Sequence, residues 1–290
     1  MLKRVDRVQI AVESLDAAEK AAAALFGAES VRHDEAEPIG AIRSTMQAGT
    51  SLIEMVRPKS RSGPVREFLD RWGQGLFGVG FSVEDLDVAA RHLESQRVPF
   101  RRATGQLFID PAATFGMRVV LSPKHERAPV GLIQWVYEVT NVVKDWRAAS
   151  DRYERIFALD QSKFVPIESK DFGYQGTLTM FDSPARLDRI EIAQPTREDL
   201  AMGRFHRKRG DSLYMFFVET GDVSAIAARI EAAGSKANVW RSDEAGAAEM
   251  FIHPNQFLGV LVGVSRTEVA WLWSGDPDRA RRAAMARASR

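Results

Sequence analysis

The stretch RVQIAVESLD, from Arg7 to Asp16, decides the fold because the same pattern returns three more times along the chain. It joins an alternating strand to an acidic turn and to the first residues of a helix. The later copies are GVGFSVEDLD from Gly78, EVTNVVKDW from Glu138 and LYMFFVETGD from Leu213. Such self-similarity at intervals is the sequence signature of a repeated structural unit. We therefore expect four copies of one unit.

Each copy is followed by a helical pattern and then closes with a second strong strand. The closing strands are SLIEMVRP (51–58), GMRVVLSP (116–123), RLDRIEIAQP (186–195) and GVLVGVS (259–265). The intervals between helix and closing strand leave room for two further strands in every unit. The turns FIDP (108–111) and FIHP (251–254) precede the second and fourth closing strands, so the units form two similar halves.

The predicted linker between the halves is the polar, proline-bearing stretch SPKHERAPVG (122–131). We expect one domain at 1–124, a second at 131–268 and a basic tail at 269–290. At about 150 residues per domain, the length of 290 residues also indicates two domains.

Composition excludes several classes of protein. The 40 Lys and Arg against 39 Asp and Glu give a net charge of +1, which argues against a nucleic-acid binder. The absence of cysteine excludes a disulfide framework, a thiolate nucleophile and a Cys-bound zinc. No apolar run reaches the roughly 18 residues of a membrane span, and no signal peptide is visible. We expect a cytoplasmic protein with a small-molecule partner; the oligomeric state stays open, and a homodimer is compatible with the sequence.

Two segments resemble a known family. Ile53–Asp87 (IEMVRPKSRSGPVREFLDRWGQGLFGVGFSVEDLD) and Phe251–Val264 (FIHPNQFLGVLVGV) are similar to methylmalonyl-CoA epimerases, members of the vicinal oxygen chelate superfamily. This superfamily also includes glyoxalase, extradiol dioxygenases and bleomycin-resistance proteins, and the resemblance spans residues 4–266. It implies an α+β fold of four βαβββ modules in two pairs, each pair forming a cupped open barrel.

The resemblance also implies where a metal would bind, at the first and last strands of each module. The four N-terminal ligand positions hold Arg7, Glu54, Gly78 and Val120. The C-terminal positions hold Glu138, Glu191, Leu213 and Gly263, and a shift of two residues would replace Leu213 with Met215. Glycine, valine and leucine carry no ligand atom, and arginine is a cation. We expect no metal in the N-terminal half, and at most a divalent ion held by Glu138 and Glu191 in the C-terminal half.

In the N-terminal half, strand alternation sends Arg7, Glu54 and Arg118 toward the cavity. One interpretation is a buried ion pair between Arg7 and Glu54 that fills a lost metal site. The other is a cationic clamp in which Arg7 and Arg118 bind a substrate carboxylate while Glu54 takes part in catalysis.

In the C-terminal half, alternation directs Glu138 and Glu191 into the cavity. Two carboxylates at short range raise each other's pKa, which suits proton transfer. They could also hold a divalent ion together with water. A third interpretation is that Arg189 neutralises them; Arg189 is also our candidate for substrate binding in this half.

Two functions remain open. The first is an isomerase or lyase that acts on a small oxygenated acid or thioester by carboxylate-mediated proton transfer. The second is a metal-free protein that sequesters a small molecule. Convergent Arg and Glu side chains would favour catalysis, whereas an apolar, aromatic cavity, with a wall of Trp135, Tyr137 and Phe217, would favour sequestration. A dioxygenase fits less well, because iron would need two histidines and a carboxylate, and the five histidines are scattered.

Overall fold

The N-terminal half builds one eight-stranded sheet with three helices. The structure is a computed structural model that describes residues 1–181, 186–241 and 248–266. The strands of this half are β1 (Leu2–Ala11), β2 (Glu29–Ala36), β3 (Ala41–Ala48), β4 (Ser51–Pro58), β5 (Gly75–Val83), β6 (Phe100–Ala103), β7 (Gln106–Ile109) and β8 (Val119–Pro123). Its helices are α1 (Leu15–Phe26), α2 (Pro64–Trp72) and α3 (Leu86–Ser95).

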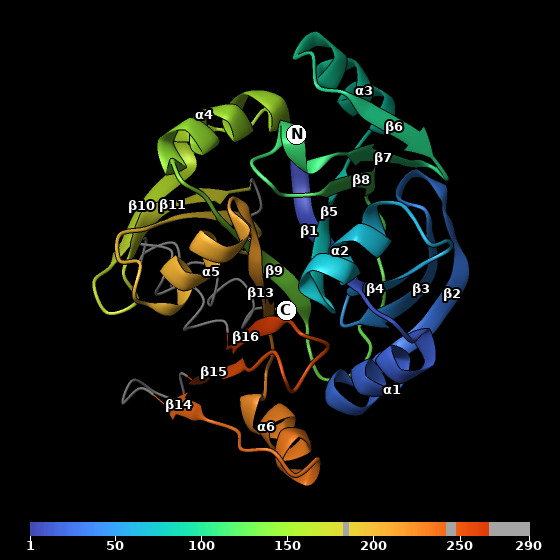
Figure 1. Ribbon diagram of the computed structural model, residues 1–290, viewed down its shortest axis with the longest axis vertical. Coiled ribbons are helices and arrows are strands. Elements are labelled where there is room, and N and C mark those ends of the chain that lie inside the picture. The colour runs from blue at the N-terminus through green and yellow to red at the C-terminus, as the bar shows by residue number, and fades with distance from the viewer. Residues whose placement is uncertain (182–185, 242–247, 267–290) are drawn as a thin grey trace.

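The C-terminal half repeats this plan within its described residues. Its strands are β9 (Trp135–Val142), β10 (Phe164–Ser169), β11 (Tyr174–Met180), β12 (Arg189–Pro195), β13 (Ser212–Glu219), β14 (Val239–Arg241), β15 (Ala248–Ile252) and β16 (Leu261–Ser265). Its helices are α4 (Trp146–Phe157), α5 (Ala201–Arg209) and α6 (Val223–Ala232). The two curled sheets lie side by side, as the blue-to-green and yellow-to-red halves of Figure 1 show.

The strand order confirms four βαβββ units in two pairs. The first sheet runs β2-β3-β4-β1-β5-β8-β7-β6, and the second runs β10-β11-β12-β9-β13-β16-β15-β14. Within a unit the first and last strands are parallel neighbours, as β1 and β4 are. The two units of each half meet at antiparallel first strands, β1 with β5 and β9 with β13. The predicted cupped sheets of the vicinal oxygen chelate fold are therefore present in both halves.

Local sequence explains the helices that follow each first strand. Ser14 accepts a hydrogen bond from the backbone N–H of Ala17 and so caps α1, while Gly27 ends the helix with a φ of 67°. Asp145 caps α4 in the same manner. Each of these helices covers one face of its own sheet; in the first sheet Val8 and Ile10 point to that face, and both side chains are fully buried in the main core. The alternate side chains of β1 then face the concave side of the cup.

Helices α2 and α5 occupy equivalent places between the units of each half. They correspond to the related segments REFLDRWGQGL (66–76) and GRFHRKRGDSL (203–213). In the N-terminal half, Val65 and Leu69 of α2 pack with Ala11 and Val56 at one end of the concave face. In the C-terminal half, Met202 of α5 belongs to the corresponding apolar cluster.

Buried hydrogen bonds join the two halves, and each involves the backbone of a central strand, β1 or β9. The backbone N–H of Val5 donates to Asp188 Oδ1 at 2.7 Å, and that of Val136 donates to Ser51 Oγ at 3.0 Å. No helix in the described parts of the chain is long and apolar enough to cross a membrane. The basic tail expected at 269–290 lies outside the described residues.

Candidate functional site

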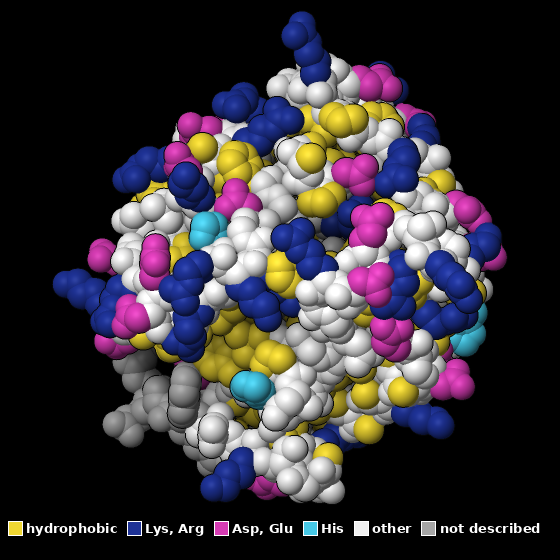
Figure 2. Space-filling view, in the orientation of Figure 1, with side chains coloured by type: hydrophobic (Ala, Val, Ile, Leu, Met, Phe, Trp, Pro, Cys, Tyr) yellow, Lys and Arg dark blue, Asp and Glu magenta, His cyan; other side chains and the backbone are white. Residues whose placement is uncertain are grey.

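A cavity of about 430 Å³ lies in the concave face of the C-terminal sheet. In Figure 2, a hollow beside α5 has apolar side chains on its floor and Lys and Arg side chains on its rim. Most of the lining is apolar, and α5 contributes Leu200, Ala201, Met202 and Arg204 near the opening. The aromatic side chains in the lining are Tyr137, Phe172, Tyr174, Tyr214, Phe217 and Phe251. Trp135, the third member of the expected wall, does not line this cavity; the guanidinium of Arg186 lies 4.6 Å from its ring centre.

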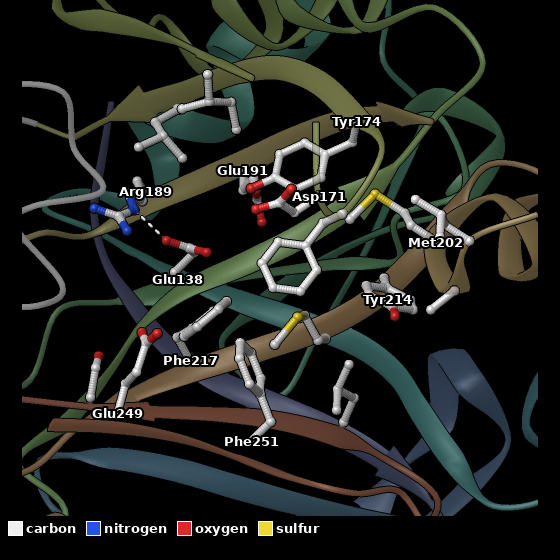
Figure 3. A pocket seen from close by; sticks show the side chains of 18 of the residues that line it. Glu138, Asp171, Tyr174, Arg189, Glu191, Met202, Tyr214, Phe217, Glu249 and Phe251 are labelled. Atoms are coloured by element: carbon white, nitrogen blue, oxygen red, sulfur yellow. Dashed lines mark hydrogen bonds and ion pairs between the residues drawn. The ribbon is translucent and has the colours of Figure 1, made fainter. Parts of the chain in front are cut away.

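Glu138, Glu191 and Arg189 lie together in this cavity, as Figure 3 shows. Glu138 is paired in register with Arg189 on the neighbouring strand, and the two side chains form a buried ion pair. Glu191 is paired with Thr140, whose hydroxyl donates a 2.5 Å hydrogen bond to Glu191 Oε2. The side chains of all three charged residues are almost completely buried. Arg189 thus pairs with Glu138, and Glu191 lies beside this ion pair.

The surroundings of Glu191 favour its protonated form. Burial, followed by the nearby charge of Glu138, raises the pKa of Glu191 to about 8. Burial and the same two carboxylates also raise the pKa of the Tyr174 hydroxyl. Near neutral pH this cavity therefore contains a carboxyl group that keeps its proton and a phenol that can donate a hydrogen bond.

The strands of the fourth unit contribute no polar ligand atom at the expected positions. Leu213 does not face the cavity: it packs in the helix-side core, because a β-bulge follows it before Met215. Met215 lines the cavity instead, opposite Thr140. A Cβ on Gly263 would lie 2.1 Å from the ring of Phe217, so the aromatic ring occupies the space that a ligand side chain would need.

The N-terminal cup is filled by a network of ions. Arg7 Nη1 donates to Glu54 Oε1 at 2.7 Å, and Arg43 Nη1 donates to the same oxygen at 3.2 Å. Gln9 Nε2 donates to the other oxygen at 2.8 Å. The opposite sides of the two arginines bind Asp6 and Asp34. Glu54 is thus fully buried between two guanidinium groups.

Burial alone would raise the pKa of Glu54, but Arg7 and Arg43 outweigh it and hold the pKa below its ordinary value. The expected ion pair between Arg7 and Glu54 is therefore present, within a larger network. Arg118 has different partners: it binds Asp110 at 2.8 Å and lies over the ring of Phe77. Arg7 and Arg118 consequently bind different carboxylates in this structure.

Two glycines make room for this network. A Cβ on Gly80 would lie 2.3 Å from Cγ of Arg7, and one on Gly78 would lie 2.7 Å from Oε1 of Gln9. Gly78 is one of the positions at which the superfamily resemblance implies a ligand. The side chain of a neighbouring strand has taken its place.

The donors at the implied metal positions are therefore few. Around Glu54 the neighbours are two guanidinium groups, which repel a divalent cation. Around Glu138 and Glu191 the neighbours are the guanidinium of Arg189, the hydroxyls of Thr140 and Tyr174, a thioether and apolar rings, while Asp171 and Glu249 line the cavity farther along. Within residues 1–181, 186–241 and 248–266, no group of three or more His, Cys, Asp or Glu side chains is arranged to hold a metal ion.

Several residues of both sites were missed by the sequence analysis. Arg43 lies on β3, a strand whose register could not be read from the sequence. Met202 and Tyr174 reach the cavity from α5 and β11. The echo between segments 66–76 and 203–213 was a signal for α5.

The matching family model identifies the N-terminal part of the chain. Residues 6–107 match the Glyoxalase/Bleomycin resistance protein/Dioxygenase superfamily. This part is a domain of that superfamily. A relative in Bacillus subtilis (strain 168), the uncharacterized protein YqjC, is 29% identical over 135 residues, which are 43% of this chain and 96% of YqjC.

Two solved structures are similar to this chain over different lengths. A mutant of 4-hydroxymandelate synthase from Streptomyces coelicolor covers 92% of this chain and 93% of its own, with 11% identity and a TM-score of 0.68. At that identity the likeness concerns the fold alone. Methylmalonyl-CoA epimerase from Streptomyces coelicolor is 22% identical and covers 43% of this chain and 100% of its own, with a TM-score of 0.39.

Proposed function

We propose that the C-terminal cavity is an active site in which Glu191 moves a proton, and that the chain is an isomerase or lyase. One observation carries the proposal: Glu191 is a buried carboxyl in an apolar cavity, with its pKa raised to about 8. A general acid–base works best when its pKa lies near the working pH. Perturbed carboxyl groups in clefts are typical of functional sites.

The proposed chemistry uses three side chains of the cavity. Ionised Glu191 would take a proton from a carbon next to a carbonyl or thioester group and return it to the same or a neighbouring carbon. The Tyr174 hydroxyl, which keeps its proton, would donate a hydrogen bond to the enolate oxygen. Arg189 would offset part of the developing negative charge while Glu138 holds its guanidinium in place.

We further propose that both metal sites of the fold have degenerated. The donors present do not suit a divalent cation, because arginine and apolar side chains stand where carboxylate or imidazole ligands are needed. The proton transfer is therefore assigned to this chain's own side chains. The activity should persist in excess EDTA.

A second candidate function has an observation of its own. The walls of the cavity are mostly aromatic and aliphatic, which suits the binding of a small apolar molecule without chemistry. A binding protein would need the cavity but would not need a proton on Glu191.

Proton exchange distinguishes the two candidates. The probe is S-methyl 2-phenylpropanethioate, an apolar thioester with one acidic C–H at its stereocentre, incubated with the protein in D₂O. Proton transfer predicts deuterium incorporation and racemisation, both lost in Glu191→Gln and kept in Glu168→Gln. Glu168 is a matched control, since it lies exposed on β10 beside the cavity residue Ile167. Binding of the probe without exchange would favour the sequestering protein.

We also propose that the protein is cytoplasmic and has no nucleic-acid or membrane partner. A homodimer is compatible with the sequence, and the oligomeric state is not assigned.

A further inference from the structure

Among residues 1–181, 186–241 and 248–266, the buried end of the C-terminal cavity contains two carboxyl groups, Glu138 and Glu191, and one guanidinium, Arg189. Arg189 is already engaged by Glu138, whereas the hydrogen-bond partner of Glu191 is the neutral hydroxyl of Thr140. Within the described residues Glu191 forms no ion pair. Asp171, Glu249 and Arg204 also line the cavity, but Asp171 and Arg204 are exposed, so water screens their charges. A buried carboxylate without a cation is costly, so a cation brought by a ligand would be stabilised here.

The walls around these carboxylates are suited to an organic cation. Tyr174, Tyr214 and Phe217 line the same cavity as Glu191, and Phe251 closes another side. The faces of aromatic rings attract ammonium groups, and the attraction is stronger where water is excluded. Aromatic faces and a carboxylate therefore converge on one space.

We infer that the ligand of this cavity is an apolar molecule carrying an ammonium group, which lies against Glu191 and the aromatic walls. The inference rests on the proposed function, because it names the substrate class of the same site. It replaces the oxygenated acid expected from the sequence with a substrate of opposite charge. The reason is that an added anion would meet Glu138 and Glu191 in a poorly hydrated space.

Binding of such a cation should also prepare Glu191 for its role as a base. The titratable and charged groups that line the cavity with Glu191 are Glu138 on β9, Tyr174 on β11, Tyr214 on β13, Glu249 on β15, Arg204 on α5, Arg189 on its own strand and Asp171 in the loop before β11. An ammonium group beside Glu191 favours the ionised carboxylate, so the proton leaves to the buffer. The ligand thereby converts the protonated carboxyl into the base.

Cations at the opening do not cancel this preference. Arg204 lines the opening, and Arg207 and Lys208 lie farther along α5; all three are exposed to water, which screens their charges. They could still attract an anionic ligand to the rim. An anionic probe therefore belongs in the test.

Three probes of similar shape test the inference. Benzyltrimethylammonium is the cation, neopentylbenzene replaces its nitrogen with carbon, and benzylphosphonate is the anion. Each is measured by calorimetry on the full chain at pH 7 and pH 8, in buffers of different ionisation enthalpy. We expect the cation to bind at least tenfold more tightly than either other probe. From a pKa of about 8, its binding should release about 0.9 proton at pH 7.

Variants assign the effect to Glu191. Glu191→Gln should lose both the tenfold preference and the proton release, while Glu168→Gln, on the outer face of β10, should keep both. Equal binding of the three probes, a preference for the phosphonate, or full selectivity in Glu191→Gln overturns the inference. So does a failure of every probe to bind, because the cavity has room for each of them.

The result is separable from the test of proton transfer. Cation selectivity with no deuterium exchange on the thioester would leave the ligand class standing and remove the enzymatic role. Exchange that depends on Glu191, without cation selectivity, would do the reverse.

Discussion

Glu54 and Glu191 occupy equivalent positions in the two halves of the molecule and have opposite surroundings. Each lies on the last strand of the first unit of its half, opposite Gln9 and Thr140 respectively. Glu54 accepts hydrogen bonds from two guanidinium groups, whereas Glu191 accepts one from a hydroxyl. The difference has two sources: the residue two places earlier on the facing strand, which is Arg7 in one half and Glu138 in the other, and Arg43, which reaches Glu54 from β3.

Neutralising these two carboxylates should change stability in opposite directions. Glu54→Gln removes the partner shared by two buried arginines and should cost about 3–5 kcal/mol in the free energy of unfolding. Glu191→Gln replaces a buried carboxyl by its uncharged isostere and should raise stability by about 3 kcal/mol at pH 7. Urea denaturation of both variants measures the difference. Equal effects of the two substitutions would contradict the assignment of opposite surroundings.

The stability of the wild-type protein should fall as the pH rises from about 5 to 8. The folded-state pKa of Glu191 is raised to about 8 from an ordinary value of 4.5. Between these values the folded chain keeps a proton that the unfolded chain has lost, so unfolding becomes easier with each pH unit. Below pH 4.5 both states hold the proton, and above pH 8 both have lost it. Melting curves of wild type and Glu191→Gln should therefore converge near pH 4.5 and separate toward pH 8.

The rate of proton exchange should have the corresponding pH profile. Because ionised Glu191 is the proposed base, the exchange rate of the thioester probe should rise nearly tenfold per unit from pH 5 to 7 and level off above about 8. The rate measured with Glu191→Gln is subtracted as background. A flat profile after this subtraction would assign the exchange to a different group.

A methyl group on Gly80 should disturb the ion network of the N-terminal half. Its Cβ would lie 2.3 Å from Cγ of Arg7, so the arginine would have to move away from Glu54. We expect Gly80→Ala to lower the free energy of unfolding by about 1–3 kcal/mol. Gly221→Ala is the control, since the nearest atom to a Cβ there is 3.9 Å away. Equal melting temperatures for the two variants would mean that Arg7 can move aside for the methyl group at little cost in stability.

A large side chain on α5 should close the cavity without harming the fold. Ala201 is exposed and lines the opening, so Ala201→Trp should weaken binding of benzyltrimethylammonium at least tenfold and leave the melting temperature within a few degrees of wild type. Lys208→Trp places the same ring on an exposed residue of the helix that does not line the cavity. Equal binding by the two variants would place the ligand elsewhere.

The sequence predicted the fold and the inward direction of Arg7, Glu54, Glu138 and Glu191 because these depend on strand periodicity, which the backbone imposes. Once the helix-facing residues of a strand are known, the alternate residues must point to the opposite, concave face of the sheet. The same reasoning failed at Leu213. A β-bulge inserts a residue and shifts the alternation, and the sequence of β13 carries no mark of it.

The contents of each site were less predictable than its location. Arg43 reaches Glu54 from β3, and Met202 reaches the cavity from α5. Both depend on how elements pack in three dimensions, which local patterns do not encode. The balance of charges in each site therefore could be determined only from the structure. One charged neighbour in each site, Arg7 or Glu138, was predicted from the sequence.

The opposite charges of Arg7 and Glu138 have a consequence for how this molecule could change over generations. In an assembly of two identical chains, one codon change alters both sites at once, so neither site can change alone. Here both cups are encoded in tandem within one gene. The N-terminal cup can keep its ion network as a stabilising element, joined to the other half by the hydrogen bonds at Asp188 and Ser51. The residues that line the C-terminal cup can then change independently. Because both cups belong to one chain, one can stabilise the fold while the other acquires a new ligand.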